Sequence, residues 1–177
     1  AICGITEEEI EENFMPEICQ MSEANNWSVQ ETHDRLKAYY DGYHFSDDNM
    51  VDIYNPYSLV NALKQRKIKN FWACSGATTL LPKFVDNAVL RLSKFENCSI
   101  MRNTLELSDV SGGGAELFLY QSGYLTIKES DEFGYILGFP NKEVKQALYE
   151  TVLPALAMRS ENEIQSLQAC LYRYLGT

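Results

Sequence analysis

Residues 39–59 read YYDGYHFSDDNMVDIYNPYSL, and this stretch holds five tyrosines, four aspartates and one of the chain's two histidines in 21 positions. Aromatic rings at this density are buried by packing against neighbouring helices, where each ring contributes roughly 1.5–3 kcal/mol. Aspartates are stable only in solvent or beside N–H donors. We therefore expect a structural clasp whose turn at 46–49 faces water. Its inward side chains would be Tyr40, Tyr43, Phe45 and Tyr54.

The sequence before this stretch predicts three helices. Thr6 and Glu9 have the capping-box form, so a helix should begin near Glu7. Pro16 either ends this helix or opens a second one. Ser28 starts the third helix, which Asp41 and Gly42 end. The expected inward residues are Ile10, Ile18 and Met21, followed by Val29, Thr32, Leu36 and Tyr40.

The sequence after Gly42 loses the helical period until Asn55, which predicts a loop or short hairpin. Asn55 and Pro56 then start another helix, because asparagine caps a helix and proline fits its first turn. The buried side of that helix would be Leu59, Val60 and Leu63. Spaced apolar residues predict a further helix at about 78–92.

The pattern changes after the run SGGG at 111–114, which we interpret as a flexible linker because no strand precedes it and no lysine follows it as in a phosphate loop. A short helix ending at Gly123, a hairpin over 124–139 and a helix capped by Asn141 follow. This order predicts a winged-helix-like unit. The fold class is therefore mainly α, with a small β component (α+β).

Composition limits the classes of function. A net charge of −10 and a pI near 4.7 oppose nucleic-acid binding, and the basic run at 64–69 is typical of a solvated helix end. Five widely spaced cysteines and the absence of an apolar run of roughly 20 residues predict a reduced cytoplasmic protein without membrane spans. Because the sequence starts at Ala1 without methionine, we expect a piece of a longer protein.

Five motifs in a fixed order resemble a bacterial family of predicted AAA-type ATPases, which are often fused to a C-terminal nuclease-like domain of the PD-(D/E)XK type. The resemblance covers roughly residues 2–157. The motifs are YYDGYHFS (39–46), DIYNPYSL (52–59), FWACSG (71–76), LYQSGYLTIK (119–128) and LGFPNKEV (137–144). At FWACSG the related proteins carry a tryptophan-containing Thr-Gly turn, so the match there is looser.

The resemblance implies a specific place in a larger protein. No GxxxxGK[ST] motif occurs, so the ATPase core that would hold ATP and Mg²⁺ is expected before this segment. Residues 1–107 would form a helical lid-like domain, 108–157 the winged-helix-like unit, and 158–177 a lead into the missing nuclease-like domain. This chain itself would then carry no catalytic residues, metal site or cofactor.

The nucleotide-facing residues would be Asn55, Pro56 and Tyr57, because a lid-helix proline packs against adenine in several ATPase classes that resemble this one. A fixed proline ring offers an apolar wall, and a helix N-terminus offers N–H donors. The alternative is a capped helix and nothing more. A metal site at His44, Asp47, Asp48 and Asp52 is disfavoured, since two adjacent aspartates without a glycine do not fit a calcium loop.

The sequence therefore predicts the lid and winged-helix-like region of an ATPase, which closes over ATP and relays its state. One alternative is a DNA-binding winged helix, although the candidate recognition helix offers only Gln121 and the acidic Glu116. Another is a protein-interaction module that binds no nucleotide. A cysteine nucleophile cannot be paired with either histidine from sequence alone.

Overall fold

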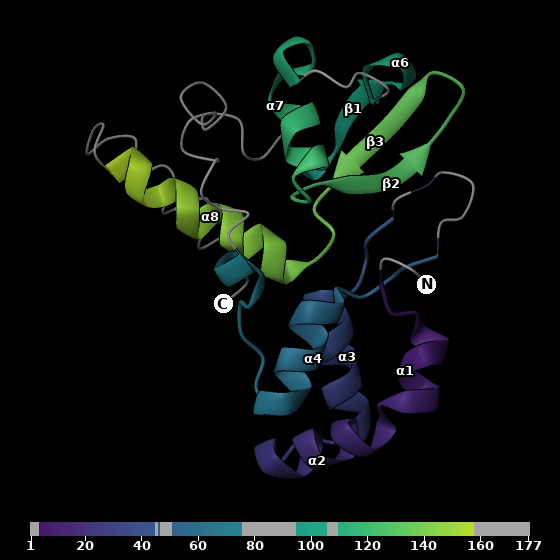
Figure 1. The fold of residues 1–177 in the computed structure, drawn as a ribbon, viewed down its shortest axis with the longest axis vertical. Coiled ribbons are helices and arrows are strands. Elements are labelled where there is room, and N and C mark those ends of the chain that lie inside the picture. The colour runs from purple at the N-terminus through teal and green to yellow at the C-terminus, as the bar shows by residue number, and fades with distance from the viewer. Residues whose placement is uncertain (1–3, 45, 47–50, 76–94, 106–109, 158–177) are drawn as a thin grey trace.

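The computed structural model describes residues 4–44, 46, 51–75, 95–105 and 110–157. Four helices form one end of the molecule and a small antiparallel sheet forms the other, with α8 beginning between them (Figure 1). The fold class is mainly α with a small β component, as predicted, and the β component is a three-stranded sheet. The helix expected at 78–92 and the lead at 158–177 lie outside the described residues.

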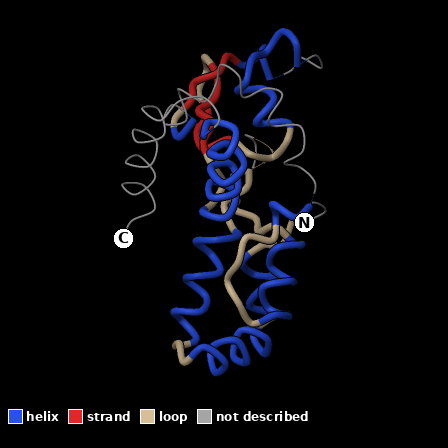
Figure 2. Tube along the Cα trace, turned by 90° about the vertical axis from the view of Figure 1, so that its left-hand side faces the viewer, coloured by secondary structure: helices blue, strands red, loops and turns tan. Residues whose placement is uncertain are grey.

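Local capping sets the ends of the four N-terminal helices, α1 (Glu7–Asn13), α2 (Met15–Asn25), α3 (Val29–Tyr40) and α4 (Pro56–Gln65). Thr6 and Glu9 form both halves of the capping box, and Pro16 opens α2. Ser28 caps α3, and the Glu31 side chain pairs with Arg35. Figure 2 shows α2 crossing the ends of α3 and α4.

The buried faces of these helices follow the predicted spacing with two exceptions. The predicted residues of α2 and the last three of α3 are buried, but Val29 is 39% exposed. On α4 the buried arc is Ser58, Leu59, Ala62 and Leu63. Val60 is 46% exposed, so its prediction as a buried residue was wrong. At 100° per residue, Val60 falls outside the arc that faces α2 and α3.

The sheet has the strand order β1-β3-β2, with β1 at Cys98–Met101, β2 at Thr126–Ser130 and β3 at Gly134–Gly138. Both pairs are antiparallel, and β2 with β3 forms the predicted hairpin. Two helices, α6 (Arg102–Leu105) and α7 (Val110–Gln121), connect β1 to β2, and α8 (Lys142–Ala157) follows. Strand β1 lies before position 108, so the sheet includes a strand from the predicted lid-like domain. The boundary between residues 107 and 108 stays a prediction.

The glycine run 112–114 lies inside α7, so the prediction of a flexible linker was wrong. Glycine has a poor helix propensity, but extending an existing helix costs far less than nucleating one. Three consecutive buried residues anchor the following turns of α7 in the core: Leu117, Phe118 and Leu119. The helix ends as predicted, with Gly123 in the left-handed region at φ 80°.

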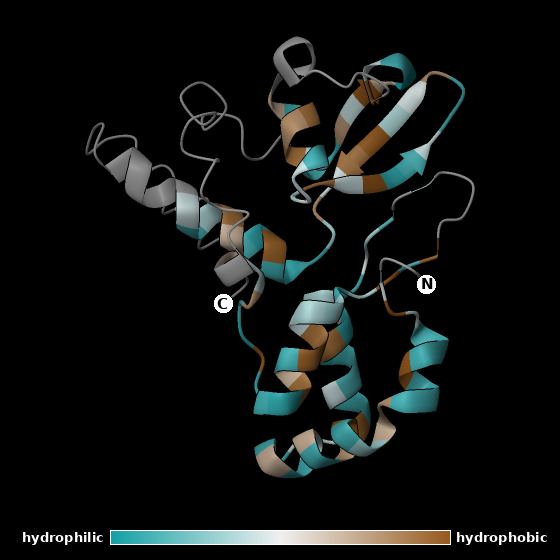
Figure 3. Cartoon of the chain, in the orientation of Figure 1, coloured by the Kyte–Doolittle hydropathy of each residue, from teal (hydrophilic) through white to brown (hydrophobic). Residues whose placement is uncertain are grey.

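Two hydrophobic clusters fill the molecule, and Figure 3 shows apolar segments on the inner faces of both parts. The helical core consists of Ile10, Ile18, Met21, Leu36, Tyr40, Tyr54, Leu59, Ala62, Leu63 and Phe71. The sheet core consists of Tyr43, Trp72, Phe95, Ile100, Phe118, Leu119, Tyr124, Leu125, Ile127, Leu137, Val144, Ala147, Leu148 and Tyr149. Across the part of the chain that is described, no helix has the length and apolar character needed to cross a bilayer.

Candidate functional site

The stretch 39–59 folds back on itself beside the N-terminal segment. Tyr43 and Ile53 exchange two backbone hydrogen bonds of 3.2 Å, and Ile5 and Tyr54 exchange two of 3.2 and 2.8 Å. These pairings form a short antiparallel ladder that leads from α3 into α4. The residues at 47–50 lie outside the described part, but the pairing of Tyr43 with Ile53 agrees with the predicted loop or short hairpin.

Three of the four predicted inward aromatics are buried, since Tyr40, Tyr43 and Tyr54 are at most 5% exposed. Burial raises the pKa of each hydroxyl. The Tyr40 hydroxyl donates to the Lys69 carbonyl at 2.9 Å, and the Tyr54 hydroxyl donates to a Glu7 carboxylate oxygen at 2.9 Å. The clasp is confirmed for these residues. Phe45 is outside the described residues, and Ser46 alone represents the predicted turn, where it is exposed.

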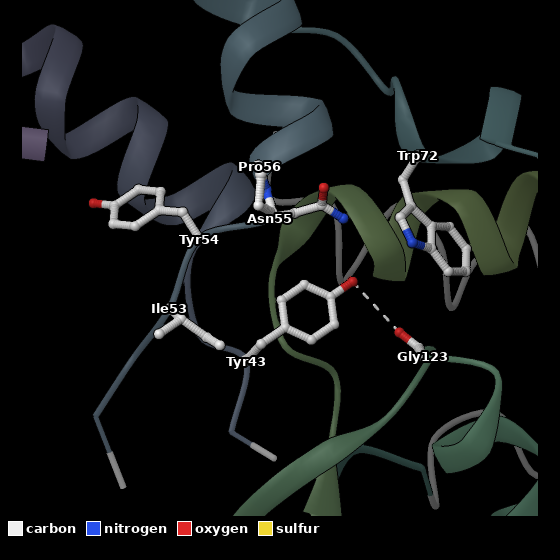
Figure 4. A pocket seen from close by; sticks show the side chains of 7 residues that line it. All are labelled: Tyr43, Ile53, Tyr54, Asn55, Pro56, Trp72 and Gly123. Carbon is white, nitrogen blue, oxygen red and sulfur yellow. Dashed lines mark hydrogen bonds between the residues drawn. The ribbon is translucent and has the colours of Figure 1, made fainter. Parts of the chain in front are cut away.

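The clasp forms one wall of an open pocket of about 320 Å³, which lies between α4 and the end of α7 (Figure 4). Asn55 and Pro56, two of the residues predicted to face a nucleotide, both line it, and Pro56 is exposed. Tyr57 is 51% exposed but does not line the pocket. The other lining residues are Tyr43, Ile53, Tyr54, Trp72 and Gly123.

Asn55 and Pro56 are placed by the start of α4. The Asn55 side-chain oxygen accepts a hydrogen bond from the Ser58 N–H at 3.2 Å, which is the predicted N-cap, and Pro56 occupies the first turn. The N-terminus of α4 thus opens beside the pocket. A helix N-terminus carries partial positive charge and N–H groups without intrahelical partners.

The polar edge of the pocket consists of Tyr43, Asn55 and Gly123. The Tyr43 hydroxyl donates to the Gly123 carbonyl oxygen over 3.4 Å (Figure 4). Burial raises the pKa of Tyr43. The Asn55 side chain donates a hydrogen bond to the Tyr43 hydroxyl oxygen, and this contact acts in the opposite direction. The Trp72 ring packs edge-on against Tyr124 at 4.6 Å between centroids.

Sequence reasoning missed Trp72 and Gly123 as members of this site. Both belong to motifs noted above, FWACSG and LYQSGYLTIK, but each is distant in sequence from Asn55. The backbone of Gly123 has φ 80°, a conformation in which a residue with a side chain would be strained. Glycine is therefore favoured at this edge of the pocket.

His44 attaches the clasp to strand β2. Its backbone N–H donates to the Thr126 hydroxyl oxygen at 2.7 Å, and its Nδ1 lies 2.9 Å from the Ile127 carbonyl oxygen. Its Nε2 lies 2.9 Å from an Asp52 carboxylate oxygen. His44 is therefore a buried histidine that is held by hydrogen bonds. Among the residues that can be described, no three histidine, cysteine, aspartate or glutamate side chains gather as a metal site; Asp47 and Asp48 fall outside them.

A half-buried lysine near His44, Lys128, joins the two parts of the molecule. The Lys128 ammonium donates to the backbone carbonyls of Gly42 at 3.1 Å and Pro140 at 3.3 Å, and burial lowers its pKa. Asp41 is 4% exposed, and burial raises its pKa to about 6. Gly42 has φ 96°, and a Cβ atom there would lie 2.3 Å from the Pro140 oxygen. Only glycine fits this crossing.

Glu143, in the first turn of α8, is fully buried and holds the chain where it passes between the two cores. One carboxylate oxygen accepts the N–H groups of Phe71 at 2.7 Å and Trp72 at 3.0 Å. Burial raises the pKa of this carboxyl, while the nearby Ser58 side chain and the two N–H groups act in the opposite direction. Trp72 is thereby fixed at the pocket wall.

Comparison with known proteins gives one relative, described as "Uncharacterized protein in vnfD 5'region" of Azotobacter chroococcum mcd 1. It is 27% identical over an aligned region of 177 positions, which covers 94% of this chain and 32% of that protein. The chain therefore spans about a third of the length of this relative. No family model and no solved structure matches the chain.

Proposed function

We propose that this chain is the non-catalytic lid and winged-helix-like region of a larger AAA-type ATPase. In this proposal an N-terminal core outside the chain binds ATP and Mg²⁺, and a nuclease-like domain follows. The five ordered motifs support the proposal, as does a relative about three times longer than the aligned segment. The separated cysteines favour a cytoplasmic location.

One observation carries the proposal: an exposed proline in the first turn of a capped helix lies at the rim of a pocket. Pro56 offers a rigid apolar surface, and the N-terminus of α4 beside it favours negatively charged groups. A helix that only needed a cap would not require an aromatic-walled pocket at its start. ATP held by the core would meet Asn55 and Pro56 as the lid closes, with the exposed Tyr57 at the outer rim.

The position of the pocket suggests how the nucleotide state would be relayed. Asn55 and Pro56 come from the helical part, whereas Gly123 follows α7 of the sheet part. A ligand that touches both parts stabilises one relative arrangement of them over others. The sheet part would pass that arrangement to the domain that follows.

The charge of the hairpin disfavours the DNA-binding alternative. Its exposed tip carries Glu129, Asp131 and Glu132, which would repel phosphates. On α7, the buried residues 117–119 cannot reach a groove. We expect no mobility shift of duplex DNA at micromolar protein and physiological salt. A shift would favour the winged-helix alternative. The protein-interaction alternative predicts that no nucleotide binds the natural protein at all.

Replacing Pro56 by alanine in the natural full-length protein tests the proposal. ATP binding should weaken by roughly 3- to 10-fold because an apolar contact is lost, while the unfolding midpoint stays nearly constant. Pro16→Ala is the matched control, since Pro16 also lies in the first turn of a helix, α2, away from the pocket. Equal ATP affinity in the two variants would exclude the lid assignment.

A further inference from the structure

We infer that the pocket binds an adenine base through its amino edge, with the Tyr43 hydroxyl and the Gly123 carbonyl as the two reading groups. This inference rests on the proposed function and deepens it, since it names the two groups of this chain that would select the base of the nucleotide. Pro56 and the start of α4 then provide contact surface for the nucleotide, while Tyr43 and Gly123 provide the hydrogen bonds that select adenine.

The two reading groups form a donor next to an acceptor. The Tyr43 hydroxyl oxygen lies 3.4 Å from the Gly123 carbonyl oxygen, well beyond the roughly 2.7–2.8 Å typical of O–H···O hydrogen bonds. Their mutual bond is therefore weak and readily exchanged for a better one. Adenine presents the complementary pair, an acceptor ring nitrogen beside the N–H groups of its amino nitrogen.

Both groups are held by rigid backbone. Tyr43 is fixed by its paired hydrogen bonds with Ile53, and its ring is 5% exposed. Gly123 is fixed at the end of α7 by a 3.0 Å bond from its N–H to the Tyr120 carbonyl. Because the Asn55 side chain donates to the Tyr43 oxygen, the hydroxyl hydrogen is directed away from Asn55. Groups placed in advance lose little freedom when a ligand binds.

The size and lining of the pocket suit a base rather than a whole nucleotide. Its volume of about 320 Å³ lies at the lower end of the range for ligand pockets, roughly 300–1,000 Å³. Ile53, Pro56 and Trp72 supply apolar surface around the polar edge. The ribose and phosphates would extend out of the pocket, toward the start of α4.

Calorimetric titration of this chain with adenosine and with purine riboside tests the inference without a substitution. Purine riboside has hydrogen in place of the amino group, so it cannot donate to the Gly123 carbonyl. We expect it to bind roughly 3- to 10-fold more weakly than adenosine, the effect of one hydrogen bond. Equal binding of the two nucleosides, or no binding of adenosine, would overturn the inference.

A pair of tyrosine variants tests the other reading group. Tyr43→Phe should weaken adenosine binding by a similar factor. Tyr39→Phe should leave it unchanged, because that hydroxyl makes an equally long contact, 3.5 Å, with Gln146 outside the pocket. Identical adenosine affinity in the two variants contradicts the inference. If adenosine results fail while Pro56→Ala still weakens ATP binding to the full-length protein, only the base-reading role is lost and the lid assignment stands.

Discussion

The helical core and the sheet core are assembled in different ways. Among the described residues, the helical core takes its members from positions 10–71, namely from four successive helices together with Tyr54 and Phe71 beside them. The sheet core combines residues 95–149 with Tyr43 and Trp72, which come from the first half of the sequence. Phe71 and Trp72 are neighbours in sequence, yet their side chains lie in different cores.

This difference shows which part of the molecule depends on the other for its core. In the part of the chain that the structure describes, the sheet core includes two buried residues from the first half of the sequence, whereas the helical core includes no residue of the sheet part. Both inserted residues also line the pocket. The site that we propose for the nucleotide is therefore the same place that couples the two cores.

Truncation of Tyr43 should have the largest effect. Tyr43→Ala removes a buried ring from the sheet core and should lower the free energy of unfolding by about 3–5 kcal/mol. Urea unfolding followed by fluorescence can assign the damage, because Trp72 lies in the sheet core and Trp27 packs against the helical core. The emission of Trp72 should change more than that of Trp27. The reverse order would break the comparison.

Removal of the Glu143 carboxylate should cost about 3 kcal/mol in Glu143→Ala, because the Phe71 and Trp72 N–H groups lose their acceptor in a buried place. Glu143→Gln retains a carbonyl oxygen and should stay within about 1 kcal/mol of the natural chain. Urea denaturation measures both. Equal losses of stability in the two variants would show that the negative charge of Glu143, and not the position of its acceptor oxygen, stabilises the junction of the two cores.

Asp41 should make the chain less stable as the pH rises. Its folded pKa of about 6 lies above the ordinary value of 3.8, so the folded state holds the proton more tightly. Its contribution is full below pH 3.8 and declines until the pH passes about 6, a loss of about 3 kcal/mol. Asp41→Asn should flatten this part of the stability profile between pH 4 and 7, as urea midpoints would show. An unchanged profile would mean that Asp41 does not titrate at the junction.

The smallest effect is expected at Val60. Because this residue is 46% exposed, Val60→Ala should change the free energy of unfolding by less than about 0.5 kcal/mol. Leu63→Ala, on the buried arc of the same helix, should cost about 2–5 kcal/mol. Similar losses of stability at the two positions would indicate that Val60 is buried, as the sequence spacing predicts.

Features set by neighbouring residues could be predicted from the sequence. The caps at Thr6, Ser28 and Asn55 depend on side chains that reach N–H groups three residues away. The hairpin and the burial of Tyr40, Tyr43 and Tyr54 follow from local patterning and from the cost of exposing aromatic rings.

Features set by distant segments could not be predicted. The exposure of Val60 and the helical state of 112–114 depend on which segments pack nearby. Two of the seven residues that line the pocket, Asn55 and Pro56, were predicted from the sequence as site residues, because they start a helix. Trp72 and Gly123 join them only through the Glu143 contact and the end of α7, which connect residues about 70 positions apart.

Hydrogen exchange in the natural full-length protein, with and without ATP and Mg²⁺, tests the central claim most directly. If the start of α4 faces the nucleotide, amide exchange over residues 53–60 should slow by about tenfold on ATP addition. Exchange in α2, which does not line the pocket, should stay constant. Unchanged exchange over 53–60, under conditions where the protein binds ATP, would contradict the claim that this region closes over the nucleotide.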